Sequence, residues 1–119
     1  METYRSTKAV INLGAIRRNT EKLIAAYPGY QYYTAVVKAD CYGYRGFEVV
    51  DAMLKGGCNT LAASLLEEGL ALREQYDLPI LLFTPAGEDD LQVMAQKDLI
   101  ATVATQEQAE IAAKIPGLR

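Results

Sequence analysis

Residues 59–83 read NTLAASLLEEGLALREQYDLPILLF, and this stretch decides the fold class. The short apolar runs at its two ends have the length and composition of buried strands. Between them, Ser64 and Glu67 have the spacing of a capping box, which predicts a helix that begins there and runs to about Tyr76. A strand, a helix and a second strand in this order are typical of a parallel sheet whose strands are joined by helical crossovers.

The same alternation continues on both sides of this stretch. Each predicted strand is short and apolar, and each predicted helix has apolar residues at helical spacing or a capping residue at its start. Strands are predicted at residues 9–12, 30–38, 59–63, 80–83 and 100–103, and helices at residues 15–27, 47–55, 64–76, 88–96 and 105–115. The five strand–helix repeats are connected without a linker, which indicates an α/β chain with one core.

The length of 119 residues limits how the sheet can close. A complete (β/α)₈ barrel needs roughly 250 residues, so the repeats form either an open sheet or only an arc of a barrel. In both kinds of parallel fold, ligands bind beyond the carboxyl ends of the strands. Candidate functional residues are therefore sought where each predicted strand ends.

Composition and charge exclude several classes of protein. With 50% hydrophobic and 23% charged residues and a net charge of -3, the chain is globular and has no electrostatic surface for nucleic acid. The absence of histidine excludes a Ser-His-Asp or Cys-His catalytic site within the 119 residues. It also means that Cys41 and Cys58 lack the histidine ligands that would complete a zinc site with them. The apolar runs are too short to span a membrane, and the polar start has no signal-peptide segment. We therefore expect a cytoplasmic protein with two reduced thiols.

Lys38 is the first candidate for chemistry, because it ends the predicted strand at residues 30–38. Burial against a sheet destabilises the ammonium form of a lysine, which is how lysines become nucleophiles and Schiff-base formers. The alternative is a lysine that extends its amine to the rim of the sheet. Position alone leaves both interpretations open.

The loop after Lys38 has the features of an anion site. Gly43 and Gly46 let the backbone approach a ligand closely and place N–H groups at the start of the next helix. The hydroxyl of Tyr42 has the chemistry to donate a hydrogen bond to the same anion. Glycines in such a loop are also compatible with a tight turn alone.

The sequence of residues 35–44, AVVKADCYGY, closely resembles the signature of the alanine racemase family, which typically reads A-V-V-K-A-(N/D)-A-Y-G-H-G. The resemblance extends over nearly the whole chain. Further similar segments are residues 10–16 with 18–19, residues 61–64 with 67–73, residues 79–81 and residues 100–105. The sequence departs from the signature at Cys41, at Tyr44 in the histidine position, and at Arg45, which is an extra residue before Gly46.

This resemblance implies pyridoxal 5'-phosphate chemistry on the first part of a (β/α)₈ TIM-type barrel. Lys38 would form the Schiff base with the cofactor and serve as the base on one face of the substrate's α-carbon, and Tyr42 would hydrogen-bond the phosphate. The substrate would be a small amino acid, either L-alanine, converted to D-alanine for the cell wall, or serine. The full-length form would be a homodimer. Residues 1–119 would be the N-terminal portion of the barrel domain, with the rest of the barrel, a β-domain and the second base absent.

Other interpretations stay open alongside the racemase. The chain is expected to be inactive alone, because Lys38 supplies only one of the two bases that racemisation needs. A catalytically inactive binding or assembly module, self-associating through an open barrel, is the alternative from another class. An amino-acid decarboxylase or a cofactor carrier is a third interpretation, and the residues at 39–43 favour the racemase over it.

Overall fold

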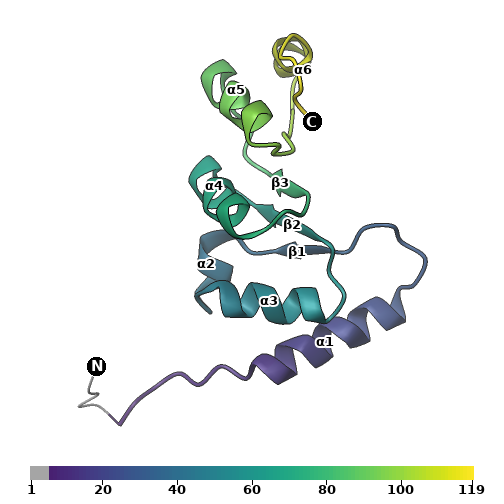
Figure 1. Cartoon of the computed structure of the whole chain (residues 1–119), viewed down its shortest axis with the longest axis vertical. Coiled ribbons are helices and arrows are strands. Elements are labelled where there is room, and N and C mark those ends of the chain that lie inside the picture. Colours follow the sequence, from purple (N-terminus) through teal and green to yellow (C-terminus); the bar gives the residue numbers. More distant parts are fainter. Residues whose placement is uncertain (1–5) are drawn as a thin grey trace.

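Six helices and three strands alternate along the described part of the chain (Figure 1). The structure is a computed structural model and describes residues 6–119. The helices are α1 (Leu13–Ala26), α2 (Lys38–Tyr42), α3 (Phe47–Lys55), α4 (Leu66–Gln75), α5 (Glu88–Gln96) and α6 (Gln106–Ala113), and the strands are β1 (Thr34–Val36), β2 (Thr60–Ala63) and β3 (Ile80–Leu82). The predicted strand–helix alternation is confirmed, and α3 and α5 have the predicted bounds.

The three strands form one parallel sheet in the order β1-β2-β3. Ala35 of β1 lies opposite Leu61, and Leu61 also lies opposite Ile80 of β3. Each strand is followed by at least one helix that returns the chain to the same end of the sheet (Figure 1). This arrangement confirms the predicted parallel sheet with helical crossovers and brings the carboxyl ends of all three strands to one edge.

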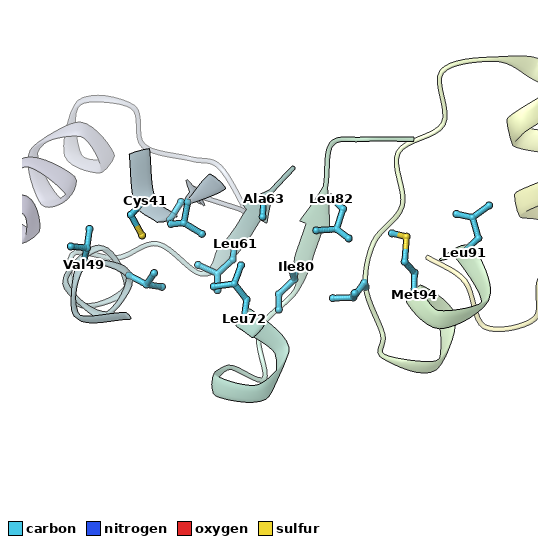
Figure 2. Packing of buried hydrophobic residues seen from close by; sticks show 13 residues of the cluster. Cys41, Val49, Leu61, Ala63, Leu72, Ile80, Leu82, Leu91 and Met94 are labelled. Atoms are coloured by element: carbon cyan, nitrogen blue, oxygen red, sulfur yellow. The ribbon is translucent and has the colours of Figure 1, made fainter. Parts of the chain in front are cut away.

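The core lies between the sheet and helices α3, α4 and α5. Alternate strand residues point to one side of a sheet. In β1 and β3 the residues on this side are the buried ones, whereas all four residues of the central strand β2 are buried. Figure 2 shows Leu61 and Ile80 beside Leu72 of α4, and Leu82 facing Met94 of α5. On the other side of the sheet Leu81 is half-buried, and Phe83 just after β3 is 40% exposed. The helices in the described chain therefore cover one face of the sheet better than the other.

The predicted strand at residues 9–12 is wrong. These residues form no strand and are exposed, with Val10 80% exposed. The segment leads away from the sheet towards the N-terminal end of the described chain (Figure 1). A β-branched run becomes a strand only where another strand pairs with it, and residues 6–119 offer it none. The predicted cap at Asn12 is confirmed, because its side chain accepts a hydrogen bond from the Ala15 N–H at 3.0 Å.

Two other predicted strands are shorter than expected. The strand predicted at residues 30–38 is limited to β1, because its neighbour β2 begins only at Thr60. Before β1, the Tyr33 N–H donates instead to the side chain of Asn59 at 2.9 Å. The strand predicted at residues 100–103 is a single bridge between Ile100 and Leu81, so a fourth strand is only begun.

Candidate functional site

Lys38 is the first residue of α2 and is separated from the end of β1 only by Val37, so it lies at the carboxyl edge of the sheet. The last ladder bond of this strand runs from the Val37 N–H to the Ala62 carbonyl at 2.8 Å. Ser64 and Thr84 occupy the corresponding places after β2 and β3, and their hydroxyl oxygens are 3.0 Å apart. The predicted position of Lys38 at this edge is confirmed, and its side chain is half-buried there.

The backbone after Lys38 forms a left-handed helical turn. Ala39, Asp40, Cys41 and Tyr42 all have φ between 53° and 58°, and the turn ends at Gly43 with φ 88°. For residues other than glycine this conformation costs roughly 1–2 kcal/mol each. The sequence predicted a glycine loop, whereas glycine occupies only the end of the turn. Such strain persists only where the surroundings hold it, and it is common at functional sites.

Hydrogen bonds and burial hold this turn from within. The Cys41 N–H donates to the Val37 carbonyl at 3.1 Å, and the Arg45 N–H donates to the Asp40 carbonyl at 3.0 Å. The Asp40 side chain accepts from the Gly46 N–H at 3.3 Å. Cys41 is 7% exposed and its side chain points into the core cluster (Figure 2). The turn is therefore fixed to β1 at its start and to the core at its centre.

Glu68 on α4 holds the turn from outside. One carboxylate oxygen accepts from the Ala39 N–H at 2.6 Å, and the other accepts from the N–H groups of Ser64 at 3.0 Å and Leu65 at 2.8 Å. Burial raises the pKa of the Glu68 carboxyl, but the three N–H donors and the charge of Lys38 outweigh it and hold that pKa below its usual range. Glu68 is therefore an anionic link between the lysine turn and the first turn of α4.

The predicted capping box at Ser64 and Glu67 is wrong by one residue. The capping position is Leu65, and Glu68 is the residue whose carboxylate reaches back to it. Ser64 does not cap, because its hydroxyl pairs with that of Thr84 across the sheet edge. Two adjacent glutamates leave the register of a capping box ambiguous in the sequence, and the contact with Ala39, 29 residues away, has no local signal.

Tyr42 lies on the same turn as Lys38. The Lys38 Nζ is 5.9 Å from the centroid of the Tyr42 ring, and Tyr42 is 59% exposed. The structure thus brings together the two predicted site residues at the strand edge. A lysine amine and a tyrosine hydroxyl on one turn have the chemistry to bind a ligand that carries an aldehyde and a phosphate. Tyr44, which replaces the histidine of the signature, is also exposed.

Beneath the turn is a mainly apolar cleft of about 270 Å³. Cys41 forms part of its wall, and burial together with the nearby Asp40 raises the pKa of the Cys41 thiol. Burial also raises the pKa of the Cys58 thiol. Cys41 is therefore a buried residue whose thiol is held in its neutral form by its surroundings. The lining residues are Val37, Asp40, Cys41, Gly46, Phe47, Val50, Glu68, Ala71 and Leu72.

Residues 6–119 contain neither a metal-binding cluster nor a membrane-spanning helix. No three His, Cys, Asp or Glu side chains in this part of the chain lie close enough to hold a metal ion. None of the helices found there is both long and apolar enough to cross a membrane. The candidate site is the carboxyl edge of the sheet, where the Lys38 amine lies near the Tyr42 ring and Glu68 binds the backbone after Lys38.

Known proteins with similar sequences are alanine racemases. The alanine racemase of Geobacillus stearothermophilus is 37% identical over 101 residues, which are 84% of this chain and 26% of that protein. The family model described as "Alanine racemase, N-terminal domain" matches residues 11–117.

Solved structures agree with the sequence match. The alanine racemase from E. faecalis has a TM-score of 0.81 at 36% identity, over 87% of this chain and 28% of that chain. The alanine racemase from Bacillus anthracis with bound L-Ala-P has a TM-score of 0.83 at 32% identity, over 98% of this chain and 30% of that chain. This chain thus spans less than a third of these relatives, and its strand–helix order is part of their barrel-type fold. Because the family model covers most of the chain, the chain belongs to the alanine racemase family.

Proposed function

We propose that the chain carries the cofactor lysine of a pyridoxal 5'-phosphate-dependent racemase that converts L-alanine to D-alanine. Serine is the second candidate among small amino acids. The observation that carries the proposal is the place of Lys38, which stands at the carboxyl end of a parallel strand beside Tyr42. Family membership supports the same reaction.

Two residues have defined roles in this proposal. Lys38 would hold the cofactor covalently through Nζ, and the same amine, once free, would move a proton at one face of the substrate's α-carbon. The Tyr42 hydroxyl would donate a hydrogen bond to the cofactor's phosphate. The cofactor, when bound, supplies an electron sink that makes the α-proton acidic enough for a weak base to remove.

The 119 residues alone supply one face of this chemistry. Racemisation needs a base on each side of the α-carbon, and Lys38 serves one side. We propose that residues 1–119 are the first part of the barrel domain, and that the second base and further cofactor contacts come from other parts of a homodimeric enzyme. The relatives' greater length supports this division of roles.

A chimeric enzyme tests the proposal directly. Residues 11–117 replace the matched segment of the Geobacillus stearothermophilus enzyme, and D-alanine formation from L-alanine is measured. We expect activity in the chimera and a loss of roughly a hundredfold or more in Lys38→Ala, because a positioned base is removed. The control is Lys22→Ala, an exposed lysine on α1, which should leave the rate unchanged. An active Lys38→Ala chimera would contradict the proposal.

A second candidate function is a catalytically inactive assembly module. Two observations favour it, the free edge of β1 and the exposed Phe83 on the less covered side of the sheet. Such a chain would self-associate and show no visible absorbance band when titrated with pyridoxal 5'-phosphate. Self-association of the isolated chain is expected in both cases, so activity of the chimera that carries residues 11–117 separates the two functions: an inactive module gives a folded chimera that forms no D-alanine.

A further inference from the structure

We propose that Glu68 is a positioning residue for Lys38: its carboxylate clamps the first backbone amide after the lysine to the start of α4. This inference rests on the proposed cofactor role of Lys38. Glu68 itself does not touch the reacting atoms in this proposal. It acts through the backbone that carries the lysine.

The two carboxylate oxygens of Glu68 have separate partners. Oε1 accepts from the N–H groups of Ser64 and Leu65, which is the capping of α4. Oε2 accepts from the Ala39 N–H, which belongs to the lysine turn and not to α4. Only a carboxylate offers two acceptor oxygens, since an amide side chain has one acceptor and two donors. The second oxygen is therefore not needed for capping.

Helix α6 shows what capping alone requires. There Gln108 is in the same position as Glu68 in α4, and its single amide oxygen accepts from the N–H groups of Ala104 at 2.7 Å and Thr105 at 3.1 Å. A glutamine thus completes this cap without a charge. At residue 68 the additional oxygen serves only the turn after Lys38.

The bond to Ala39 fixes the lysine because it completes a pair of anchors. The peptide plane before Lys38 is held through the Val37 carbonyl, which accepts from the Cys41 N–H. The peptide plane after Lys38 is held through the Ala39 N–H by Glu68. Since each peptide unit is rigid, anchoring both planes fixes the backbone dihedral angles of Lys38 and the direction in which its side chain leaves the sheet. Without Glu68, the strained turn has one anchor fewer.

Amide hydrogen exchange in the 119-residue chain tests the clamp without cofactor. In Glu68→Gln the cap should persist, as at Gln108, while the Ala39 amide should exchange about tenfold faster or more, because a charge-assisted hydrogen bond is lost. The Ser64 and Leu65 amides should change little. Gln108→Ala is the matched control, which should release the Ala104 and Thr105 amides and leave Ala39 protected. Circular dichroism verifies that each variant is folded.

Two exchange results would overturn the clamp. One is an Ala39 amide that is unprotected in the unsubstituted chain. The other is an Ala39 amide that is as well protected in Glu68→Gln as in the unsubstituted chain. This holds even if the Ser64 and Leu65 amides of the cap exchange faster in the variant.

The link to Lys38 is tested by trapping. The chimera that carries residues 11–117 is incubated with pyridoxal 5'-phosphate and reduced with borohydride, and the label on the Lys38 peptide is measured relative to the Lys22 peptide. We expect slower labelling of Lys38 in the Glu68→Gln chimera, with the Lys22 peptide and the Gln108→Ala chimera unchanged. Equal labelling of Lys38 in the unsubstituted and Glu68→Gln chimeras, together with faster Ala39 exchange, overturns the positioning role and leaves the proposed function standing. No label on Lys38 in the unsubstituted chimera overturns the proposed function itself.

Discussion

At the scale of single residues, the site depends on a strained backbone and not on glycine. Four residues with side chains occupy the left-handed region between Lys38 and Gly43. Their conformation puts Cys41 into the core and leaves Tyr42 at the surface near the Lys38 amine. An extended loop would point successive side chains in other directions, so the turn is what brings the lysine and the tyrosine to one place.

The pH dependence of stability tests the charge of Glu68. The pKa of its carboxyl is lower in the folded chain than the ordinary 4.5, so the unfolded chain takes up a proton at higher pH than the folded chain. The stabilisation from Glu68 is thus fully present at pH values above the ordinary pKa of the carboxyl. It is lost as the pH falls through the lower pKa that the carboxyl has in the folded chain. Urea denaturation of the unsubstituted chain and of Glu68→Gln should show a stability difference that shrinks as pH falls below about 4.5. A stability difference between the two forms that stays constant as the pH falls below about 4.5 would contradict the stabilising role of the Glu68 charge.

The sequence predicted two of the three residues that make this site. Lys38 and Tyr42 could be found because a buried strand followed by a lysine and a glycine loop is a local pattern. Glu68 could not, because its partner Ala39 is distant in the sequence and is reached only once α4 packs beside the turn. The left-handed turn was also missed, since non-glycine residues adopt it only where tertiary contacts hold them.

At the scale of elements, the close packing of α4 against β3 fixes the height of Glu68 over the sheet. Gly69 is buried at this contact, and a Cβ there would lie 2.7 Å from Leu82 Cδ2 and 3.0 Å from Cδ1. The first distance is shorter than carbon atoms tolerate, and the second is a tight contact, so the Leu82 side chain would have to shift. The absence of a side chain at Gly69 therefore sets how near the helix can approach.

Gly69→Ala should destabilise the chain although alanine favours helices. Overpacking costs typically 1–3 kcal/mol, and the gain in helix propensity offsets about 1 kcal/mol of it. We expect the free energy of unfolding, measured with urea, to fall by up to about 2 kcal/mol. The control is Gly14→Ala in α1, where a Cβ meets only the ends of the Arg18 and Asn12 side chains, and stability should be unchanged or higher. A Gly69→Ala variant as stable as Gly14→Ala would contradict the packing.

Helices were predicted more accurately than strands for a physical reason. A helix satisfies its backbone within one segment, so caps such as Asn12 and Thr105 and the periodicity of α3 and α5 determine it locally. A strand depends on its neighbours, so residues 9–12 and 100–103 have strand-like composition but little or no pairing. The sequence therefore predicted the order of elements well and the extent of the sheet poorly.

At the scale of the whole molecule, the described chain is extended for its length. Its radius of gyration is 16.8 Å, whereas a compact domain of this size has about 13.5 Å. Within residues 6–119, β1 lies at an edge of the sheet and only a single bridge lies beyond β3. This open shape agrees with the match of the chain to part of the barrel-type fold of the alanine racemases.

Self-association is the expected consequence when the chain is isolated. Unpaired strand edges and exposed apolar side chains such as Val10 and Phe83 favour contacts between copies. Sedimentation velocity should show a weight-average mass that rises with concentration above the monomer's 13.1 kDa. A charged substitution on the open side, Phe83→Glu, should reduce the association. A monomer at all concentrations would contradict this expectation.

The central claim is that Lys38 is the residue that binds the cofactor, and peptide mapping after reduction tests it most directly. The active chimera is loaded with pyridoxal 5'-phosphate, reduced with borohydride and digested, and the labelled peptides are identified by mass spectrometry. The account predicts one stoichiometric label on the peptide containing Lys38 and loss of that label in Lys38→Ala. A reduced, inactivated enzyme whose label lies on another lysine, with the Lys38 peptide unmodified, would contradict it.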